Sequence, residues 1–390
     1  MFHLPDYIVQ ILDTLTAAGF QAFAVGGCVR DLLRGVVPND YDVTTNALPN
    51  EVEALFEHTV PTGVQHGTVT VVINSHPIEV TTFRQEFGYT DSRHPDRVSY
   101  VSFVEEDLAR RDFTVNAMAY HPKVGIVDPF GGQDDLKNGI LRTVGEASVR
   151  FEEDALRILR LFRFAATLGF SMEESSLEAA LKLSGLLKNI SRERIAAELL
   201  KTLLGKNVSA LTPLLQNGGL KFLGIGYQNP LDKISRLPQK DALRLFAFLH
   251  CCHAPLSVLK ELRYSNAIGS AVHSLFQLQA LDTLKTDVEI KQALRSFGRE
   301  RVEDYFAFRS VFHNEDTTER EQLLQQIFDR REPYDISHLC VDGNDLKNLG
   351  IRGRETGFVL QKLCDLVLAN PSLNKPEILF KKAKEIKEQN

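Results

Sequence analysis

The stretch "AVGGCVRDLLRGVVPNDYDV", residues 24–43, decides the fold of the N-terminal part of the chain. Apolar residues that end at a glycine pair predict a buried strand and a tight turn, and the residues after the turn predict a short helix. Asp40 and Asp42 then stand two positions apart on a second predicted strand, residues 40–46. Side chains at i and i+2 of a strand lie on the same face. The stretch therefore predicts strand, turn, helix and strand, with two carboxylates side by side.

These residue types together indicate a site for a metal-bound triphosphate. Two adjacent carboxylates repel each other unless a cation lies between them, and hard oxygen ligands suit Mg²⁺. Gly26 and Gly27 leave backbone N–H groups and a helix start open to a phosphate, and Arg30 adds a positive charge. Glu79, in "PIEVTTF", is predicted to point away from the core-facing Ile78 and Val80 and is a third candidate ligand. The alternative for Glu79 is an edge-strand glutamate that faces solvent.

The rest of the chain divides into a mixed part and a helical part. Two segments rich in β-branched residues, "GTVTVVI" and "PIEVTTF", flank "NSH" and predict a hairpin within the first 130 residues or so. From residue 145 onward the apolar spacing is almost entirely helical. With 390 residues, 43% of them hydrophobic and 25% charged, the chain is expected to fold as several subdomains. The sequence therefore predicts an α+β head followed by helices.

Composition restricts the cellular setting and the partners. The net charge of -6 gives no overall attraction to nucleic acid, so such a partner requires a local basic surface. Five cysteines without a framework spacing favour a reducing compartment, and the cytoplasm is the expected location. No apolar run reaches the length of a membrane span, so no membrane association is expected.

Five ordered motifs resemble those of a known family. "GGCVRD" followed by "DYDV" resembles its first motif, "RRDFTVNAMAY" its second and "DPFGGQDDLKNGILRTVG" its third. "EEDALRILRLFRFAATLGF" is similar to its base-recognition motif, and "SRERIAAELLK" to the fifth motif, which braces it. The chain is therefore identified as a member of the DNA polymerase β-like nucleotidyltransferase superfamily, specifically as a class II tRNA nucleotidyltransferase, or CCA-adding enzyme, of the bacterial type.

The resemblance implies a fold and a division of the chain. The fold class is α+β, with a polymerase β-like head that holds a small mixed sheet and helices, followed by an all-helical neck, body and tail. The expected domains are a catalytic head at 1–138, a base-recognising neck at 139–205, a body at 206–300 and a tRNA-binding tail at 301–390. Within the tail, the family's proline-rich turn is replaced by "RGRE", residues 352–355.

The resemblance also implies an activity and its residues. The expected reaction is template-independent addition and repair of the 3′-terminal CCA of tRNA, using CTP and ATP and releasing pyrophosphate by two-metal transfer. Asp40 and Asp42 are the implied catalytic residues and Mg²⁺ ligands, with Glu79 as a further candidate ligand. Glu153 is implied to support base recognition. The implied nucleotide-binding residues are Gly27, Arg30, Arg111, Asp112, Asp154, Arg157, Arg160 and Arg163.

Base recognition depends on a predicted helix. Helical spacing places Glu153, Asp154 and Arg157 on one side, with Ile158, Leu159 and Phe162 on the other. An ordinary salt-bridged amphipathic helix gives the same pattern. The resemblance instead implies that Asp154 and Arg157 meet the Watson–Crick edge of the incoming base, where the carboxylate accepts from an exocyclic amino group and the guanidinium donates to ring acceptors.

The implied partners are CTP, ATP and the acceptor stem, 3′ end and elbow of tRNA, and a homodimer stays open. Residues 83–103 are predicted to form a mobile loop, whose presence favours activity with ATP. Three alternatives are an enzyme that adds only A, a bacterial poly(A) polymerase, and a non-enzymatic tRNA-binding protein with an inactive head.

Overall fold

The computed structural model describes residues 2–63, 67–87, 97–281 and 284–388, which form two compact units. The first unit comprises residues 1–232 and 251–263, and the second comprises residues 233–250 and 264–390. The tip of the predicted mobile loop, residues 88–96, lies outside the described residues. No helix of the described residues combines the length and the apolar character that crossing a membrane requires.

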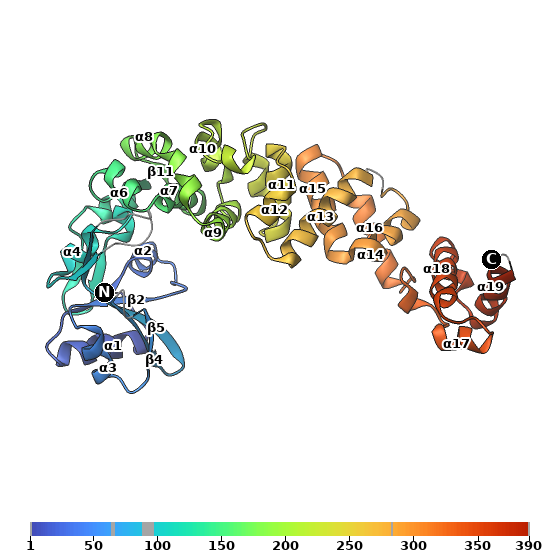
Figure 1. Ribbon diagram of the computed structural model, residues 1–390, viewed down its shortest axis with the longest axis horizontal. Coiled ribbons are helices and arrows are strands. Elements are labelled where there is room, and N and C mark those ends of the chain that lie inside the picture. Colours follow the sequence, from blue (N-terminus) through green and yellow to red (C-terminus); the bar gives the residue numbers. More distant parts are fainter. Residues whose placement is uncertain (1, 64–66, 88–96, 282–283, 389–390) are drawn as a thin grey trace. The chain divides into compact units, whose positions relative to one another are not determined.

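A mixed sheet with the strand order β3-β4-β5-β2-β1-β8-β9 lies in the N-terminal part of the first unit, where Figure 1 labels β2, β4 and β5. Neighbouring strands are antiparallel except β2 and β5, which run parallel. The α+β prediction is therefore confirmed. The strands of this sheet are β1 (Ala22–Val25), β2 (Asp42–Thr45), β3 (Thr59–Gly63), β4 (Thr68–Ile73), β5 (His76–Thr82), β8 (Ala119–His121) and β9 (Gly125–Val127).

Both faces of the central strand β1 are buried. Ala22 and Ala24 pack into one apolar cluster with Ile8 and Ile11 of the first helix, while Phe23 and Val25 pack into a second cluster on the opposite face. Successive residues of a strand point to opposite faces, so every residue of β1 contributes to a core. Because β1 is buried on both faces, its position in the sheet is fixed, and so is the position of the glycine turn that follows it. The helices and 3₁₀ turns of this head are α1 (Asp6–Ala17), α2 (Gly27–Leu33), α3 (Pro49–Leu55), α4 (Val104–Ala109), η2 (Thr114–Asn116) and α5 (Gly132–Asn138).

The predicted hairpin is confirmed, and its turn has a clear physical cause. Ile73 pairs with His76 across Asn74 and Ser75, which have φ values of 49° and 66°. Two positive φ angles give the backbone twist that matches two adjacent antiparallel strands. The register of this hairpin places His76 at its tip and fixes Glu79 on β5.

The described part of the predicted mobile loop is regular structure. β6 (Arg84–Phe87) and β7 (Arg97–Tyr100) pair as an antiparallel ribbon, so the prediction of a loop over all of 83–103 is wrong for these residues. Polar and apolar residues alternate in Arg97–Tyr100, as the strand period of two requires, whereas Arg84–Phe87 begins with three polar residues and gives no such signal.

Helices follow the sheet in the remainder of the first unit. α7 packs against α9, and Ile158, Leu159 and Phe162 are buried as predicted. A short parallel pair, β10 (Ile140–Leu141) and β11 (Ser171–Met172), also contacts α7. These helical elements are α6 (Ala147–Glu153), α7 (Leu156–Leu168), α8 (Glu174–Lys182), η3 (Ser184–Asn189), α9 (Arg192–Leu203), η4 (Val208–Leu211), α10 (Thr212–Gln216), η5 (Lys221–Leu223) and α12 (Ser257–Glu261).

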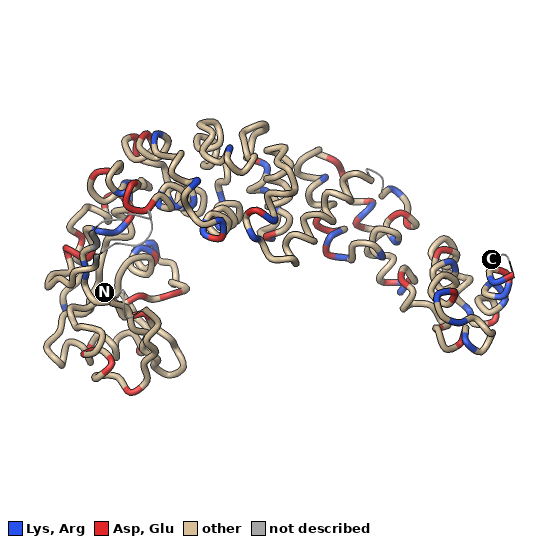
Figure 2. Tube along the Cα trace, viewed as in Figure 1, with Lys and Arg blue, Asp and Glu red and all other residues tan. Residues whose placement is uncertain are grey.

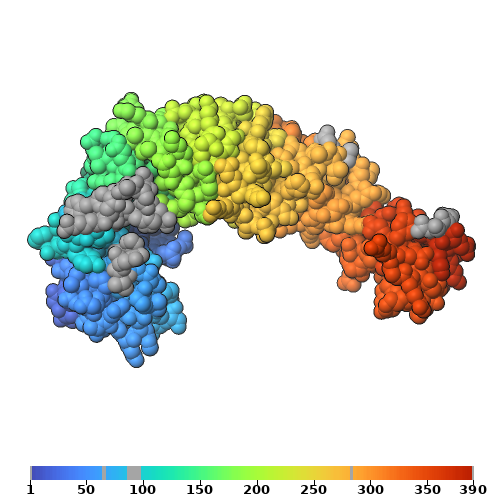
Figure 3. Space-filling model, viewed as in Figure 1, coloured from blue at the N-terminus to red at the C-terminus, as the bar shows by residue number. Residues whose placement is uncertain are grey.

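The second unit is helical in the described residues. Its last helices, red in Figure 3, share a core that includes Leu346, Val359, Leu363 and Leu379. At "RGRE", Gly353 has a φ of 65° and immediately precedes α18, so a glycine supplies the turn there. The elements are η6 (Asp232–Arg236), α11 (Asp241–Cys252), α13 (Asn266–Leu281), α14 (Asp287–Phe297), α15 (Arg299–His313), α16 (Thr318–Asp329), η7 (Ile336–His338), α17 (Gly343–Asn348), α18 (Arg354–Ala369), η8 (Pro371–Leu373) and α19 (Pro376–Glu388).

Candidate active site

The glycine turn after β1 begins the candidate site. Gly26 has a φ of 80°, and a Cβ there would lie 2.8 Å from Nη1 of Arg111. Both the backbone angle and the close approach therefore require glycine at this position. The predicted short helix is present, but it begins at Gly27, one residue earlier than expected, and the Gly26 N–H donates to the carbonyl of Met118. The turn thus joins the first motif to the second.

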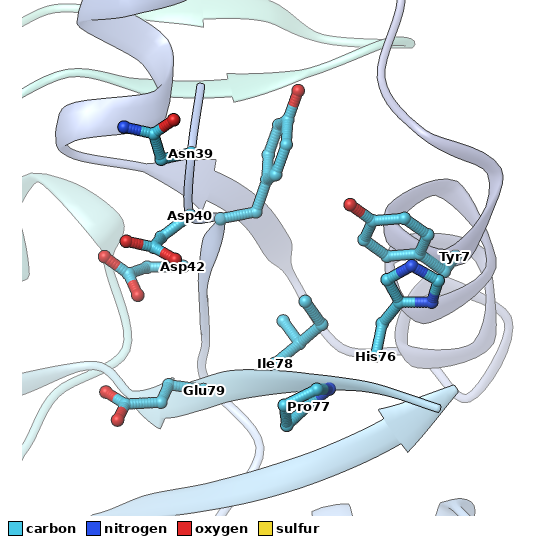
Figure 4. Close-up of a pocket in the computed structure, with 9 residues that line it drawn as sticks. Tyr7, Asn39, Asp40, Asp42, His76, Pro77, Ile78 and Glu79 are labelled. Carbon is cyan, nitrogen blue, oxygen red and sulfur yellow. The ribbon is translucent and has the colours of Figure 1, made fainter. Parts of the chain in front are cut away.

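Asp40 and Asp42 lie together on one side of the second strand (Figure 4). β2 begins at Asp42, so Asp40 belongs to the segment before the strand rather than to the strand itself. Tyr41 and Val43 are buried between and beyond them, and this holds both carboxylates toward the exposed side. The structure therefore brings the two aspartates together as predicted, but with only one of them on the strand.

Glu79 extends this acidic wall. It pairs with Asp42 in the register of the parallel strands β2 and β5, and its side chain lies on the same side as the aspartates in Figure 4. Desolvation by the surrounding protein raises the pKa of Asp42, and the charges of Glu79 and Asp40 raise it further, while Arg111 lowers it. Excess negative charge gathered in this way favours a bound cation.

The described residues hold no group of three His, Cys, Asp or Glu side chains arranged to bind a metal ion. Asp40 and Asp42 offer carboxylate oxygens from one wall, which fits a divalent cation in chemistry and in charge. Glu79 as a third ligand stays a prediction.

A cavity of about 650 Å³ opens beside the aspartates. Its wall combines the acidic pair with the glycine turn and with arginines from α2, from the segment after α4 and from α7, and Figure 2 shows basic residues on α2 and α7. Six of the eight predicted nucleotide-binding residues therefore meet here, and Asp154 and Arg157 do not. The lining residues are Gly26, Gly27, Cys28, Arg30, Asp31, Asn39, Asp40, Asp42, Arg111, Asp112, Asn116, Arg160, Arg163, Phe164 and Lys201.

Arg30 and Arg111 supply positive charge near the glycine turn. Arg30 donates to Oδ1 of Asn116 at 2.7 Å and pairs with Asp31 at 2.9 Å. Arg111 makes a 3.4 Å contact with Asp107, and its buried Nε has no hydrogen-bond partner in the described part of the chain. A buried donor without a partner is costly, so an anionic ligand that accepts from it stabilises the site.

Asp112 is held ionised inside the wall. Burial alone would raise its pKa, but the charge of Arg160 and hydrogen bonds from Asn116 and Arg160 hold the pKa at about 2. One oxygen accepts from the Phe113 N–H and from Asn116, and the other accepts from Arg160 at 2.7 Å. Asp112 is therefore positioned by three donors at the edge of the cavity.

The predicted geometry of the base-recognition residues is wrong. α6 ends at Glu153, Asp154 is extended with φ of -137° and ψ of 101°, and α7 begins at Leu156. Glu153, Asp154 and Arg157 therefore do not share one helix face. The oxygen Oδ1 of Asp154 accepts from the Leu156 N–H at 3.0 Å, which stabilises the break between the helices.

Each of these residues is nevertheless held by a specific partner. Arg157 pairs with Glu153 at 2.6 Å, as predicted, and also donates to the carbonyl of Arg110 at 2.9 Å. Asp154 pairs with Arg194 of α9 at 2.9 Å, which confirms that the fifth motif braces the fourth. Asp154 and Arg157 do not appear in the lining of the 650 Å³ cavity, so their contact with a base stays a prediction.

Arg160 and Arg163 follow on α7 and face the cavity. Arg160 pairs with Asp112 at 2.5 Å, and Arg163 pairs with Glu198 of α9 at 2.5 Å while lying 3.7 Å from the ring centre of Phe164. Sequence analysis assigned no role to Asn116, Phe164 or Lys201, which also line the cavity. All three lie within the quoted motifs, and this position was the only indication in the sequence that they belong to the site.

Comparison with known proteins assigns the family. Residues 22–142 match the family described as the poly A polymerase head domain, and residues 169–223 match the one described as the probable RNA and SrmB-binding site of polymerase A. A CCA-adding enzyme of Geobacillus sp. (strain WCH70) is 37% identical over 346 residues, which cover 86% of this chain and 85% of the relative. The chain belongs to the CCA-adding enzyme family. The resemblance inferred from the five motifs is confirmed, and the protein is a nucleotidyltransferase.

Solved structures of CCA-adding enzymes share this fold. The Bacillus stearothermophilus CCA-adding enzyme, solved in complex with CTP, is 30% identical with a TM-score of 0.83, and the match covers 98% of each chain. The Thermotoga maritima CCA-adding enzyme, solved with tRNA, has a TM-score of 0.70 at 21% identity over 97% of this chain and 94% of that one. Both likenesses extend beyond the head through the helical part of the chain.

Proposed function

We propose that this protein adds and repairs the 3′-terminal CCA of tRNA without a template, using CTP and ATP. The observation that carries the proposal is the 650 Å³ cavity, where Asp40 and Asp42 face a wall of glycine turn and arginines. The aspartates suit a divalent cation, and the glycine turn with the arginines suits a triphosphate. The full-length likeness to a CCA-adding enzyme solved with CTP supports this substrate class.

The proposed reaction is nucleotidyl transfer to the RNA end. The oxygen of the tRNA 3′-hydroxyl bonds to the α-phosphorus of the nucleotide, the bond between the α-phosphorus and the bridging oxygen breaks, pyrophosphate leaves, and the hydroxyl proton passes to solvent. Arg30, Arg111 and the backbone of Gly27 bind the triphosphate in this proposal, and Arg160 and Arg163 position it. Asp112 accepts from the ribose 2′-hydroxyl, which selects ribonucleotides.

Asp40 and Asp42 are the proposed metal ligands, with Glu79 beside them. Mg²⁺ held there would neutralise phosphate charge and favour loss of the hydroxyl proton. The raised pKa of Asp42 and its proximity to two further carboxylates fit that assignment, because a divalent cation relieves the like-charge repulsion.

Base choice is assigned to Asp154 and Arg157. In this proposal their side chains meet the Watson–Crick edge of C or A, with Glu153 and Arg194 holding them in place. Because α6 ends at Glu153, Asp154 lies in an extended link between two helices, where a small backbone rotation re-aims its carboxylate. Such a link allows one pair of side chains to accept two different bases.

The proposed division of labour assigns catalysis to residues 1–138, base recognition to 139–205, and tRNA contacts to the body at 206–300 and the tail at 301–390. The tRNA acceptor stem and 3′ end approach the head, and the tail contacts the elbow. We propose the cytoplasm as the site of action, because tRNA is the substrate.

One assay tests the activity directly. The protein is incubated with Mg²⁺ and tRNA transcripts that end before CCA, after C or after CC, and each nucleotide is offered separately. Addition of C, then C, then A supports the proposal. Addition of A only to the transcript ending in CC indicates the A-adding alternative, and long A tails indicate a poly(A) polymerase. Absence of incorporation by the wild-type protein on every transcript contradicts the proposed function.

A further inference from the structure

A second cavity shares the catalytic aspartates with the first. It has a volume of about 500 Å³, within the range of about 300–1,000 Å³ that small-molecule sites occupy. Asn39, Asp40 and Asp42 line both cavities, so the acidic pair forms the partition between them. The remaining lining residues are Tyr7, Tyr41, His76, Pro77, Ile78 and Glu79.

The two cavities differ in the charge that they offer. The larger cavity is lined by Arg30, Arg111, Arg160, Arg163 and Lys201. Among the described residues, no lysine or arginine lines the smaller cavity, whose charged residues are all carboxylates. Triphosphate is therefore favoured in the larger cavity, whereas the smaller one suits an uncharged group that carries hydroxyls.

An aromatic surface stands opposite the carboxylates in the smaller cavity. The rings of Tyr7 and His76 stack at 4.2 Å with an angle of 9° between their planes, and Tyr41 packs edge-on to Tyr7. Figure 4 shows Tyr7 and His76 on one side and Asp40, Asp42 and Glu79 on the other. His76 is exposed, its ring stacks on Tyr7, and both residues line the cavity, so a base that enters the cavity meets an aromatic surface.

Both members of the stacked pair are held by rigid elements. Tyr7 lies in the first turn of α1, beside the buried Ile8, and His76 is fixed by the hairpin register with Ile73. A pair that is already stacked loses little conformational entropy when a base joins it.

We propose that the smaller cavity receives the 3′-terminal nucleoside of the RNA acceptor, with its base on the Tyr7–His76 surface and its 3′-hydroxyl beside Asp40 and Asp42. The proposal rests on the proposed function, in which the incoming nucleotide occupies the larger cavity. The smaller cavity, on the other side of the aspartates, is then free for the RNA acceptor. The nucleoside end fits because it presents hydroxyl donors to the carboxylates, whereas a phosphodiester would be repelled. Tyr7 and His76 are positioning residues in this scheme, because stacking tolerates any base at the RNA end.

Variant kinetics test the acceptor assignment. Tyr7→Ala, His76→Ala and the double variant are compared with Tyr7→Phe, which keeps the ring, and with His58→Ala, which removes an exposed histidine outside the cavity. With a transcript that ends before CCA, we expect the double variant to raise the KM for RNA about tenfold, as base–aromatic stacking predicts. The KM for CTP should stay within about twofold, and Tyr7→Phe and His58→Ala should behave like wild type.

A spectroscopic assay separates stacking from a merely structural role. The same transcript carries 2-aminopurine as its 3′-terminal nucleotide, whose fluorescence falls when it stacks. Wild type and Tyr7→Phe should quench it and the double variant should not, with thermal unfolding recorded for each variant. Unchanged RNA KM and unchanged quenching in the double variant would overturn the proposal, and so would equal rises in the KM for RNA and CTP. If wild type incorporates no nucleotide, the proposed function fails, while quenching still reports on the aromatic surface because it requires no chemistry.

Discussion

The acidic wall formed by Asp40, Asp42 and Glu79 and the wall formed by the arginines of α7 differ in whether their charges are paired. On α7, Arg157, Arg160 and Arg163 each pair with a carboxylate. Asp40 just before β2, Asp42 on β2 and Glu79 on β5 form no ion pair with any cation in the described part of the chain, although the charge of Arg111 lowers the pKa of Asp42. Paired charges fix the positions of side chains, whereas carboxylates without a paired cation remain ready to bind one. The comparison predicts that substitutions on the two walls fail in different ways.

The largest expected effect is on the acidic wall. Asp42→Asn keeps the shape of the side chain but removes the charge, and we expect nucleotide incorporation to fall by about a thousandfold or more. Thermal stability should stay equal or rise, because a like-charge contact is lost. Incorporation assays and thermal unfolding measure the two quantities, and tRNA binding serves as the control. If Asp42→Asn unfolds, Asp42 is required for stability, and the predicted difference between the acidic wall and the arginines of α7 is contradicted.

The next effect concerns a buried pair on the opposite wall. Glu198→Gln leaves Arg163 without its 2.5 Å partner, and we expect a loss of about 3 kcal/mol in the free energy of unfolding. Glu193→Gln is the matched control, because Glu193 lies on the same helix and pairs with Arg263, but its side chain is 52% exposed against 8% for Glu198. Urea denaturation should show no measurable change for Glu193→Gln. Equal losses in both variants would contradict the assigned role of burial.

A third effect is pH dependence from Asp112. Its folded pKa of about 2 lies below the ordinary value of 3.8, so the ionised carboxylate contributes stability that is present above pH 3.8 and lost as the pH falls toward 2. The contribution is at most about 2 kcal/mol. The difference in unfolding free energy between wild type and Asp112→Asn should therefore shrink between pH 4 and pH 2. A difference that stays constant across this window would show that Asp112 and Arg160 are not coupled.

The smallest expected effect concerns the brace between the fourth and fifth motifs. Arg194→Ala frees Asp154, and we expect the preference for CTP over UTP to fall about tenfold while the unfolding free energy changes little. Competition between the two nucleotides measures the preference. Arg192→Ala on the same helix, which contacts Glu261 at 3.7 Å, should leave it unchanged. Loss of preference in both variants would assign the effect to α9 as a whole.

Sequence analysis predicted the features that depend on near neighbours. The glycine turn follows from a positive φ that only glycine adopts readily, and the hairpin follows from two segments of matching period. The helix break at Asp154 was missed, because "FEEDALR" contains neither glycine nor proline. That break is stabilised by the local bond from the Leu156 N–H to Asp154 and also by Arg194, forty positions away, and no local propensity encodes the second contact.

The candidate site shows the same limit. Asp40, Asp42, Arg30 and Arg111 were identified from motifs, and the cavity brings them together. Lys201 joins the same wall from the end of α9, and only the packing of α7 on α9 places it there. The aromatic surface was equally hidden, because Tyr7 and His76 meet through the fold of α1 against the hairpin.

The contact between Gly26 and the second motif also sets when the site can form during synthesis. The Gly26 N–H bonds to Met118, Arg30 bonds to Asn116, and β1 pairs with β8. When only the first hundred residues have emerged from the ribosome, the glycine turn and both aspartates are therefore outside the tunnel, but β8, which pairs with β1, is not. Chains stalled before β8 should emerge unable to retain nucleotide, so the head gains its ligand only after its last strands leave the exit tunnel.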